Sequence, residues 1–422
     1  MQLLAGVSAA SLLASKTVQK KADRIDTRDA VLPTSTLITD FQKDGVNSTW
    51  AQGFPKAWGS EALYIEGPVV ADVSADEKFI VLVAGSNLTV RSLDTQHVLA
   101  SANLEYQGYY TSVSLLADRG SGYNIFVSIE NYTTYSVLTH LSLSADGATL
   151  GKPNQYVGEL LNIDGRQGLF SKDGRRFLLK VAETLHADIK DRVVIYDLDK
   201  PGTNITLIGH TDMIISAAFN SDGTLVSTTG WDGYGKVWNA STGELLNSLG
   251  PSNSQNWITR FSPDDKYVML SYTGKKPGVD IWPVANLSAA PTVISNYPEW
   301  IRAASWSSNS TLLATGSGGL IQIYSMTEKK VIQRWEMEDH SNYEPGDFVW
   351  IEGVNTLKLA YRTTGGLEVY DFVANLKYRW GPDVYAQYDG GGSGYDTILI
   401  KSKGWIGGQD ADQSVRFYNF AV

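Results

Sequence analysis

The stretch AAFNSDGTLVSTTGWDGYGKVWNASTGELL (217–246) decides the fold, because it has a close counterpart in ASWSSNSTLLATGSGGLIQIYSMTEKKVI (304–332). Each copy has an apolar segment, a polar turn, a second apolar segment, a Gly-containing turn and an alternating segment that ends in an aromatic residue. Alternation of apolar and polar residues followed by a short turn is the pattern of antiparallel β-strands. The chain therefore contains an internal repeat of short strands.

Two series of positions measure the length of this repeat. The aromatic residue that closes the third strand recurs every 42 to 48 residues, at Tyr196, Trp238, Trp282, Tyr324, Tyr370 and Tyr418. The apolar residue that ends the first strand recurs at Phe170, Phe219, Phe261, Trp306, Trp350 and Leu399, with weaker matches upstream at Val73 and Leu115. Four-stranded units of this length are typical of β-propeller blades. We predict an all-β fold, a single propeller with eight blades, or seven if residues 101–160 form an insertion.

One unit resembles a known repeat. The segment GHTDMIISAAFNSDGTLVSTTGWDGYGKVWN (209–239) is similar to a WD repeat in its Gly-His pair, its Asp in the turn between the second and third strands, and its Trp. DQSVRFYN (412–419) is a second match. No unit other than 209–239 has the Gly-His pair, and most lack the turn Asp. The resemblance implies a structural hydrogen-bond network of His210, Asp232, Thr228 or Ser227, and Trp238. It also implies a platform for interactions with other molecules.

The ends of the repeat region predict how the ring closes. The last unit ends at Val422 after its third strand, and ALYIEG (62–67) lies just before the first unit. We expect this N-terminal segment to supply the missing strand, which leaves no open sheet edge. The predicted organisation is a signal-like segment at 1–15, an extension packed on or near the propeller at 16–61, and the propeller at 62–422.

Composition excludes several kinds of site. The chain has no cysteine, so disulfides, thiolate metal sites and cysteine nucleophiles are excluded. Its five histidines are scattered and predict no zinc site, and no phosphate-loop signature is present, so we expect neither a metal nor a cofactor. The net charge of −10 argues against a nucleic-acid partner.

Two features predict the secretory route. Residues 1–14 (MQLLAGVSAASLLA) are apolar and small but too short to span a bilayer. Asn-X-Ser/Thr sequons occur at seven positions: Asn47, Asn87, Asn131, Asn204, Asn239, Asn286 and Asn309. Chance would give roughly two or three in a chain of this length. We expect a secreted, glycosylated protein without a transmembrane segment; the alternative is a cytoplasmic protein.

In WD-repeat proteins, residues at fixed positions in each repeat lie at the mouth of the central channel. In this sequence, many of the residues at these positions are basic or aromatic. The position four residues before the end of the first strand is Arg166, Trp257, Arg302 or Tyr395 in four of the units. The turns between second and third strands add His186, Trp231 and Arg362, with Lys190, Lys275 and Lys276. Arginine suits carboxylates, and aromatic rings offer flat surfaces. We predict that this mouth binds an anionic saccharide or an acidic protein segment, on a protein that is a monomer.

Three functions are compatible with such a mouth. The first is a secreted, noncatalytic binding module. The second is a polysaccharide lyase on uronic-acid-containing glycans, in which Arg166 and Arg302 neutralise the carboxylate and His186 or Tyr395 removes the adjacent proton. The third is an intracellular WD-repeat scaffold. A hydrolase is disfavoured, because the mouth offers no carboxylate pair. The acidic pair Asp264-Asp265 is expected to be solvated in a turn on the opposite face.

Overall fold

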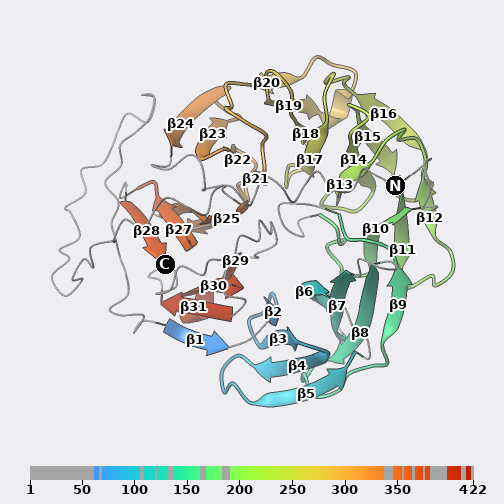
Figure 1. Ribbon diagram of the computed structural model, residues 1–422, viewed down its shortest axis with the longest axis vertical. Coiled ribbons are helices and arrows are strands. Elements are labelled where there is room, and N and C mark those ends of the chain that lie inside the picture. The colour runs from blue at the N-terminus through green and yellow to red at the C-terminus, as the bar shows by residue number, and fades with distance from the viewer. Residues whose placement is uncertain are drawn as a thin grey trace, which may run out of the picture.

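The computed structural model shows eight sheets arranged as a ring (Figure 1). It describes residues 61–65, 69–104, 109–118, 121–130, 136–161, 168–182, 191–336, 346–353, 356–363, 366–373, 376–380, 397–409 and 415–419. The predicted signal-like segment and all but the last residue of the predicted extension lie outside these ranges.

We number the sheets as blades in chain order. Blade one contains β2 (Val69–Val73), β3 (Phe79–Ala84), β4 (Asn87–Ser92) and β5 (Val98–Asn103), and blade two contains β6 (Tyr109–Asp118), β7 (Gly122–Glu130), β8 (Val137–Ser144) and β9 (Asn154–Val157). Blade three contains β10 (Arg176–Ala182), β11 (Asp191–Asp197) and β12 (Ile205–Leu207), and blade four contains β13 (Ile214–Phe219), β14 (Leu225–Gly230), β15 (Gly235–Asn239) and β16 (Leu245–Leu249).

The second half of the chain continues in the same order. Blade five contains β17 (Asn256–Phe261), β18 (Tyr267–Tyr272), β19 (Gly278–Pro283), the 3-10 turn η3 (Val284–Asn286) and β20 (Thr292–Ile294), and blade six contains β21 (Ala303–Trp306), β22 (Leu312–Ser317), β23 (Leu320–Ser325) and β24 (Lys330–Glu336). Blade seven contains β25 (Gly346–Gly353), β26 (Thr356–Thr363), β27 (Gly366–Asp371) and β28 (Leu376–Trp380), and blade eight contains β29 (Thr397–Ile400), the 3-10 turn η4 (Lys401–Lys403), β30 (Trp405–Gln409), β31 (Val415–Asn419) and β1 (Glu61–Ile65).

The structure confirms the eight-bladed propeller. Residues 109–157 form the four-stranded sheet β6-β7-β8-β9, so this region is a blade and not an insertion. The third-strand aromatics of blades four to eight, from Trp238 to Tyr418, are each at most 6% exposed. They therefore belong to the core, as their regular spacing predicts.

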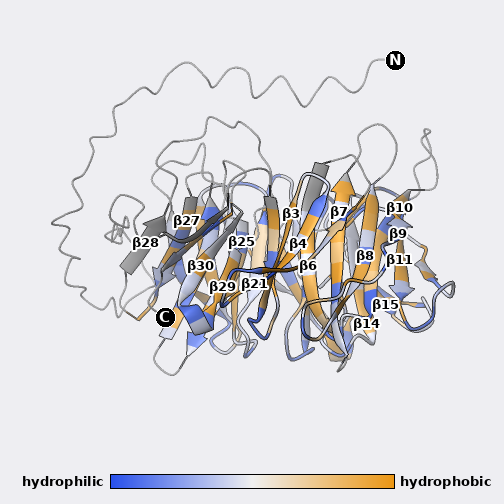
Figure 2. Ribbon diagram, turned by 90° about the horizontal axis from the view of Figure 1, so that it is seen from below, coloured by the Kyte–Doolittle hydropathy of each residue, from blue (hydrophilic) through white to orange (hydrophobic). Residues whose placement is uncertain are grey.

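Both faces of most sheets are covered by neighbouring blades, which explains the nearly continuous apolar strands. Every side chain of β23 (LIQIYS) is buried, and five of the six in β3 (FIVLVA) are buried. Figure 2 shows the apolar residues along the strands and the polar ones at the turns. One core cluster joins Ile195 and Leu207 of blade three to Val226 and Trp238 of blade four. The hydrophobic core thus lies between the blades.

Blade three departs from the four-stranded pattern. Its sheet contains β10, β11 and β12, and its inner position is occupied by two isolated bridges, Glu159 with Lys180 and Phe170 with Phe177. Residues 162–167 between these bridges lie outside the described residues. Within the described residues, these two bridges represent the first strand of this unit.

The predicted ring closure is confirmed. The N-terminal strand β1 pairs antiparallel with β31, with Leu63 opposite Phe417 and Ile65 opposite Val415. Strand β1 begins at Glu61, one residue before the predicted segment. The first and last parts of the repeat region are thus joined in one sheet.

The two faces of the ring carry different turns. We call the upper face the one with the turns between second and third strands and the connections between blades. The lower face carries the turns between first and second strands and between third and fourth strands.

On the lower face, carboxylates of one blade bind the first turn of the preceding blade. Asp265 accepts hydrogen bonds from the Ser221 backbone N–H (2.8 Å) and hydroxyl (2.5 Å). Glu352 accepts one from the Ser308 backbone N–H (2.9 Å). Asp265 is therefore not simply a solvated turn residue, as the sequence predicted, but connects blades four and five.

A carboxylate also connects two blades in this way where the ring closes. The carboxylate of Glu77 in blade one accepts the backbone N–H groups of Lys401 (2.8 Å) and Ser402 (2.7 Å) in blade eight. Burial alone would raise the pKa of Glu77, but these hydrogen bonds outweigh it and lower the pKa below the usual 4.5. The ionised form of Glu77 thus stabilises the closed ring.

We expect Glu77→Gln to destabilise the protein by about 1 kcal/mol at pH 7, since the site is partly exposed. Because the pKa of Glu77 is lowered by folding, its contribution is present above pH 4.5 and is lost as the pH falls through the folded-state value. Thermal unfolding across this pH range measures the difference between wild type and variant. A difference that persisted unchanged in strong acid would contradict this account; Glu244→Gln, at an exposed position, is the control.

Candidate functional site on the upper face

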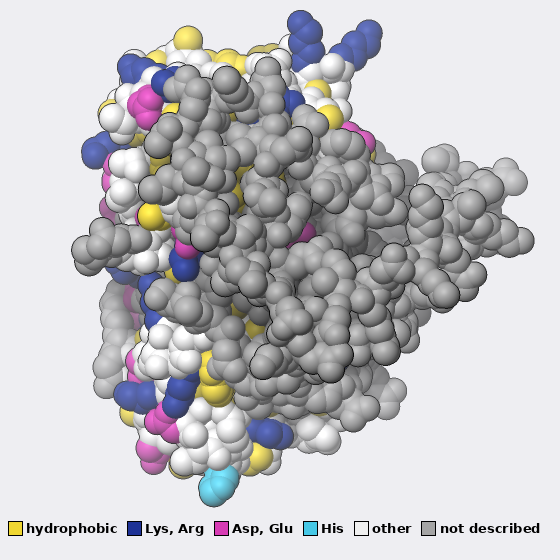
Figure 3. Space-filling view, turned by 90° about the vertical axis from the view of Figure 1, so that its left-hand side faces the viewer, with side chains coloured by type: hydrophobic (Ala, Val, Ile, Leu, Met, Phe, Trp, Pro, Cys, Tyr) yellow, Lys and Arg dark blue, Asp and Glu magenta, His cyan; other side chains and the backbone are white. Residues whose placement is uncertain are grey.

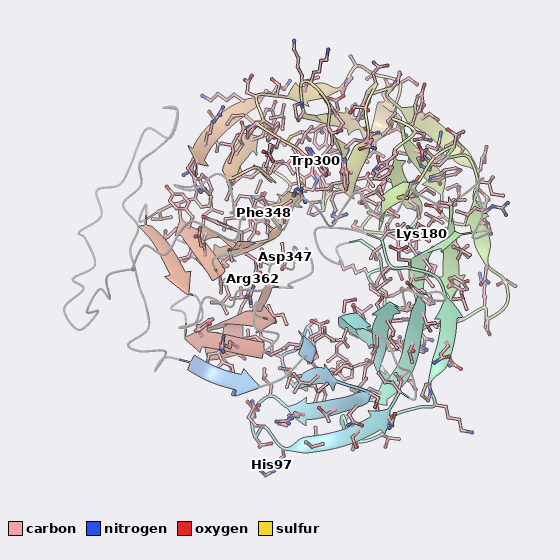
Figure 4. The ribbon with its side chains drawn as sticks, viewed as in Figure 1. His97, Lys180, Trp300, Asp347, Phe348 and Arg362 are labelled. Atoms are coloured by element: carbon pink, nitrogen blue, oxygen red, sulfur yellow. The ribbon has the colours of Figure 1, made fainter. Side chains whose placement is uncertain are left out.

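Three tryptophans from neighbouring blades meet on the upper face. Trp231 lies in the turn after β14, Trp257 lies in β17, and Trp300 lies in the connection from β20 to β21. The ring centroids of Trp231 and Trp257 are 5.8 Å apart, and those of Trp257 and Trp300 are 4.9 Å apart with the rings inclined by 31°. We call these three residues the tryptophan ridge; Figure 4 shows Trp300 beside the inner strands of blades five and six.

The outer end of the ridge is exposed and bordered by charge. Trp300 is 41% exposed, and the guanidinium of Arg302 lies 4.8 Å from its ring centroid, within cation–π range. Lys275 and Lys276 are exposed in the β18–β19 turn on the same face. The connection also carries an exposed carboxylate, Glu299, at a position that was not among those predicted for the mouth.

The structure brings together three of the seven residues that the sequence predicts as ligand contacts. Trp231, Trp257 and Arg302 belong to the ridge or its border. Arg166, His186 and Tyr395 lie outside the described residues, so their roles stay predictions.

The predicted position of Arg362 in an exposed turn is wrong. Arg362 lies within β26 and is 6% exposed. Strand β26 spans eight residues, two more than β14, β18 and β22, so a residue expected in the turn falls in the strand. Figure 4 shows Arg362 beside Asp347 near the centre of the ring, away from Trp300.

The hydrogen-bond network of blade four has the geometry that the WD-repeat resemblance implies. Trp238 Nε1 donates to Thr228 Oγ1 (2.8 Å), which lies 2.8 Å from His210 Nε2, and His210 Nδ1 lies 2.8 Å from Asp232 Oδ2. The threonine hydroxyl therefore donates to Nε2, and Nδ1–H donates to the carboxylate. A Cβ at Gly209 would lie 3.0 Å from the Trp238 ring, so the glycine of the Gly-His pair allows close packing there.

This network also holds the turn that carries Trp231. Asp232 Oδ1 accepts the backbone N–H of Tyr234 (3.1 Å), and Oδ2 accepts that of Thr211 (3.2 Å). Burial raises the pKa of Asp232, but the hydrogen bond from His210 and these N–H groups outweigh burial and lower it. Trp231 directly precedes Asp232, so the first residue of the ridge stands on a fixed turn.

Blade six replaces the histidine with a tyrosine. The hydroxyl of Tyr297, which is 6% exposed, lies 2.7 Å from Thr315 Oγ1, and Thr315 occupies in β22 the place that Thr228 occupies in β14. Because Tyr297 takes the place of the histidine, no Gly-His pair marks this unit in the sequence. The connection that carries Trp300 is thus anchored at Tyr297, as the β14–β15 turn is anchored at Asp232.

We expect Tyr297→Phe to reduce the free energy of unfolding by about 1–2 kcal/mol, because Thr315 would lose a buried partner. Urea unfolding of the variant measures this loss. Tyr267→Phe, at a half-buried position of blade five, is a control that should have a smaller effect. An unfolding curve of Tyr297→Phe that matched wild type would show that the hydroxyl pair is not structural.

In the part of the chain that the structure describes, no other group of surface side chains forms a candidate site as well defined as the tryptophan ridge. Among the described residues, no group of three or more His, Asp or Glu side chains is placed to hold a metal ion. No helix in the described ranges is long and apolar enough to cross a membrane. On the side of the ring in Figure 3, the described basic and acidic side chains are interspersed. The tryptophan ridge is therefore the best-defined candidate site.

Comparisons with known proteins agree with this architecture. The model of the WD domain, G-beta repeat, matches residues 203–239 and 292–325, which include the His210 network and the Trp300 connection. The chain is 26% identical over 130 residues to the chicken (Gallus gallus) serine-threonine kinase receptor-associated protein, covering 30% of this chain and 36% of that protein. It is 26% identical over 208 residues to an uncharacterized WD repeat-containing protein of Synechocystis, covering 44% and 55%.

A solved structure shows the same overall fold. A chain in the crystal structure of the mitotic checkpoint complex matches with a TM-score of 0.50 at 14% identity, covering 86% of this chain and 92% of that one. The chain spans about a third to a half of the length of these curated relatives.

Proposed function

We propose that this WD-repeat-like β-propeller is a noncatalytic module that binds a partner protein through the tryptophan ridge and Arg302. The observation that supports this is the exposed end of the ridge, where Trp300 packs against Trp257 and lies beside Arg302. Trp and Arg are the side chains most often found at energetic centres of protein interfaces. The connection that carries Trp300 is anchored by the Tyr297–Thr315 hydrogen bond, which reduces the conformational freedom lost on binding.

The partner segment is expected to be acidic with an apolar side chain at its centre. Arg302 and the exposed Lys275 and Lys276 attract carboxylates, and Trp300 supplies an apolar contact. The anionic saccharide is less favoured, because Arg302 already covers a face of the Trp300 ring on which a sugar would stack. Glu299 at the border disfavours segments that are acidic throughout.

A phage-displayed library of random peptides, selected on the full chain, tests this proposal. We expect the selected peptides to share acidic residues beside an aromatic or aliphatic residue. We also expect them not to bind the Trp300→Ala variant. An array of uronate-containing glycans tested in parallel measures the saccharide alternative. The proposed partner would be wrong if the protein bound glycans and no peptides, or if the selected peptides bound the Trp300→Ala variant as tightly as wild type.

We also propose that the protein follows the secretory route and is a monomer. The supporting observations are the apolar residues 1–14 and the excess of sequons over chance. A reporter protein fused behind residues 1–15 should be secreted from eukaryotic cells, and light scattering should give the mass of one chain. In the lyase alternative, Arg166 and Arg302 neutralise the uronate carboxylate and His186 or Tyr395 removes the adjacent proton. Release of an unsaturated, ultraviolet-absorbing product from uronate glycans is its test.

A further inference from the structure

Four sequons fall on the lower face, one in each of four consecutive blades. Asn204 directly precedes β12, Asn239 ends β15, Asn286 ends η3 between β19 and β20, and Asn309 lies in the turn between β21 and β22. The first three are in turns between third and fourth strands, and the fourth is in a turn between first and second strands. We call these four residues the lower sequons.

The lower sequons are accessible at the positions where a glycan would be attached. Asn204, Asn286 and Asn309 are exposed, and Asn239 is half-buried. Asn309 Oδ1 accepts the Thr311 backbone N–H (3.0 Å), and Asn239 Oδ1 accepts that of Ser241 (2.8 Å). At Asn239 and Asn309 the carbonyl oxygens thus face their own turns, so the amide nitrogens, to which glycans are joined, are directed away from them.

The tryptophan ridge lies at the other end of the same blades. Blades four, five and six carry Trp231, Trp257 and Trp300 on the upper face and a lower sequon on the other. Strands of about six residues separate the two faces by roughly 20 Å. Of the remaining sequons, Asn87 begins β4 on the upper face of blade one, across the ring from the ridge (Figure 1), and Asn47 and Asn131 lie outside the described residues.

We propose that the lower face of blades three to six is a glycosylated face, which leaves the tryptophan ridge as the open face of these blades. This rests on the proposed secretory route but not on the identity of the ridge's partner. In the reaction, an asparagine Nδ2 forms a bond to the first sugar of an oligosaccharide and loses a proton. The bond that breaks joins this sugar to a lipid diphosphate carrier, which leaves. A partner can then approach these blades from the upper face, where the tryptophan ridge lies, without meeting the glycans.

The full chain, expressed in eukaryotic cells behind a heterologous signal peptide, tests the proposal. Peptide mass spectrometry after enzymatic release of glycans should find Asn204, Asn286 and Asn309 converted to aspartate. The substitutions Thr206→Val, Ser241→Ala, Ser288→Ala and Thr311→Ala remove the four sequons and keep the asparagines. Secretion with these asparagines unmodified would overturn the glycosylated face, and it would leave the separate reporter test of residues 1–15 unaffected.

Hydroxyl-radical labelling of Trp300 tests that the glycans leave the ridge open. The labelling rate should be the same in wild type and in the variant without lower sequons. Gln255→Thr creates a sequon at Asn253, an exposed residue on the upper face close in sequence to Trp257, and should lower the rate several-fold. A rate that rose when the lower sequons were removed would show that their glycans reach the ridge, and the inference would be wrong.

Discussion

Replacing Asp232 with alanine is expected to lower the free energy of unfolding by about 3 kcal/mol at pH 7. The Asp232 side chain is 4% exposed and accepts hydrogen bonds from His210 Nδ1 and from the backbone N–H groups of Thr211 and Tyr234. The variant leaves all three donors in place without their acceptor. Urea unfolding followed by intrinsic fluorescence measures the loss, and hydrogen exchange should locate it in blade four.

The pH dependence gives an independent check of the same carboxylate. The pKa of Asp232 is lowered by folding from its usual 3.8, so its contribution is present above pH 3.8 and is lost as the pH falls through the folded-state value. Wild type should therefore approach the variant in stability only in strong acid. Asp212→Ala, at an exposed aspartate of the same blade, should change stability little. An equal effect of the two substitutions would mean that the network does not stabilise the blade.

The fold could be predicted because the repeat imposes the same requirement on each blade. The residue that closes each third strand packs between two sheets, so it must be large and apolar, as Trp238 and Tyr418 are. The closing strand was predictable because ALYIEG (62–67) lies directly before the first unit, and β1 pairs with β31 there. Blade two was the weakest match because β6 and β7 span ten and nine residues, longer than the strands of later blades.

The site was less predictable, because it depends on turns that the repeat does not constrain. One mouth position per blade was selected, and Trp300, two residues before Arg302 in the same connection, was therefore missed. Arg362 was misplaced because β26 is longer than its equivalents. Tyr297 and Asp265 were missed as structural groups because their partners, Thr315 and Ser221, lie 18 and 44 residues away. Such contacts have no local sequence pattern.

Trp300→Ala is expected to weaken binding of the tightest selected peptide by about 2 kcal/mol, roughly 30-fold in Kd. Trp300 is the exposed end of the ridge, so its removal takes away the apolar surface and the ring beside Arg302. Isothermal titration calorimetry measures the change. Val293→Ala, which removes an exposed apolar side chain on outer strand β20, should leave Kd unchanged.

The lysines of the same face should behave differently from the ridge. Lys275→Ala and Lys276→Ala are expected to weaken binding by a few tenths of a kcal/mol each, because both side chains are exposed and solvated. Their effect should disappear at high salt, whereas the effect of Trp300→Ala should remain, since burial of apolar surface is not screened. If salt abolished the loss caused by Trp300→Ala as well, long-range charge and not the ridge would govern recognition. If the ridge binds by direct apolar contact, Trp300→Ala must therefore weaken binding strongly, and this loss of affinity must remain at high salt.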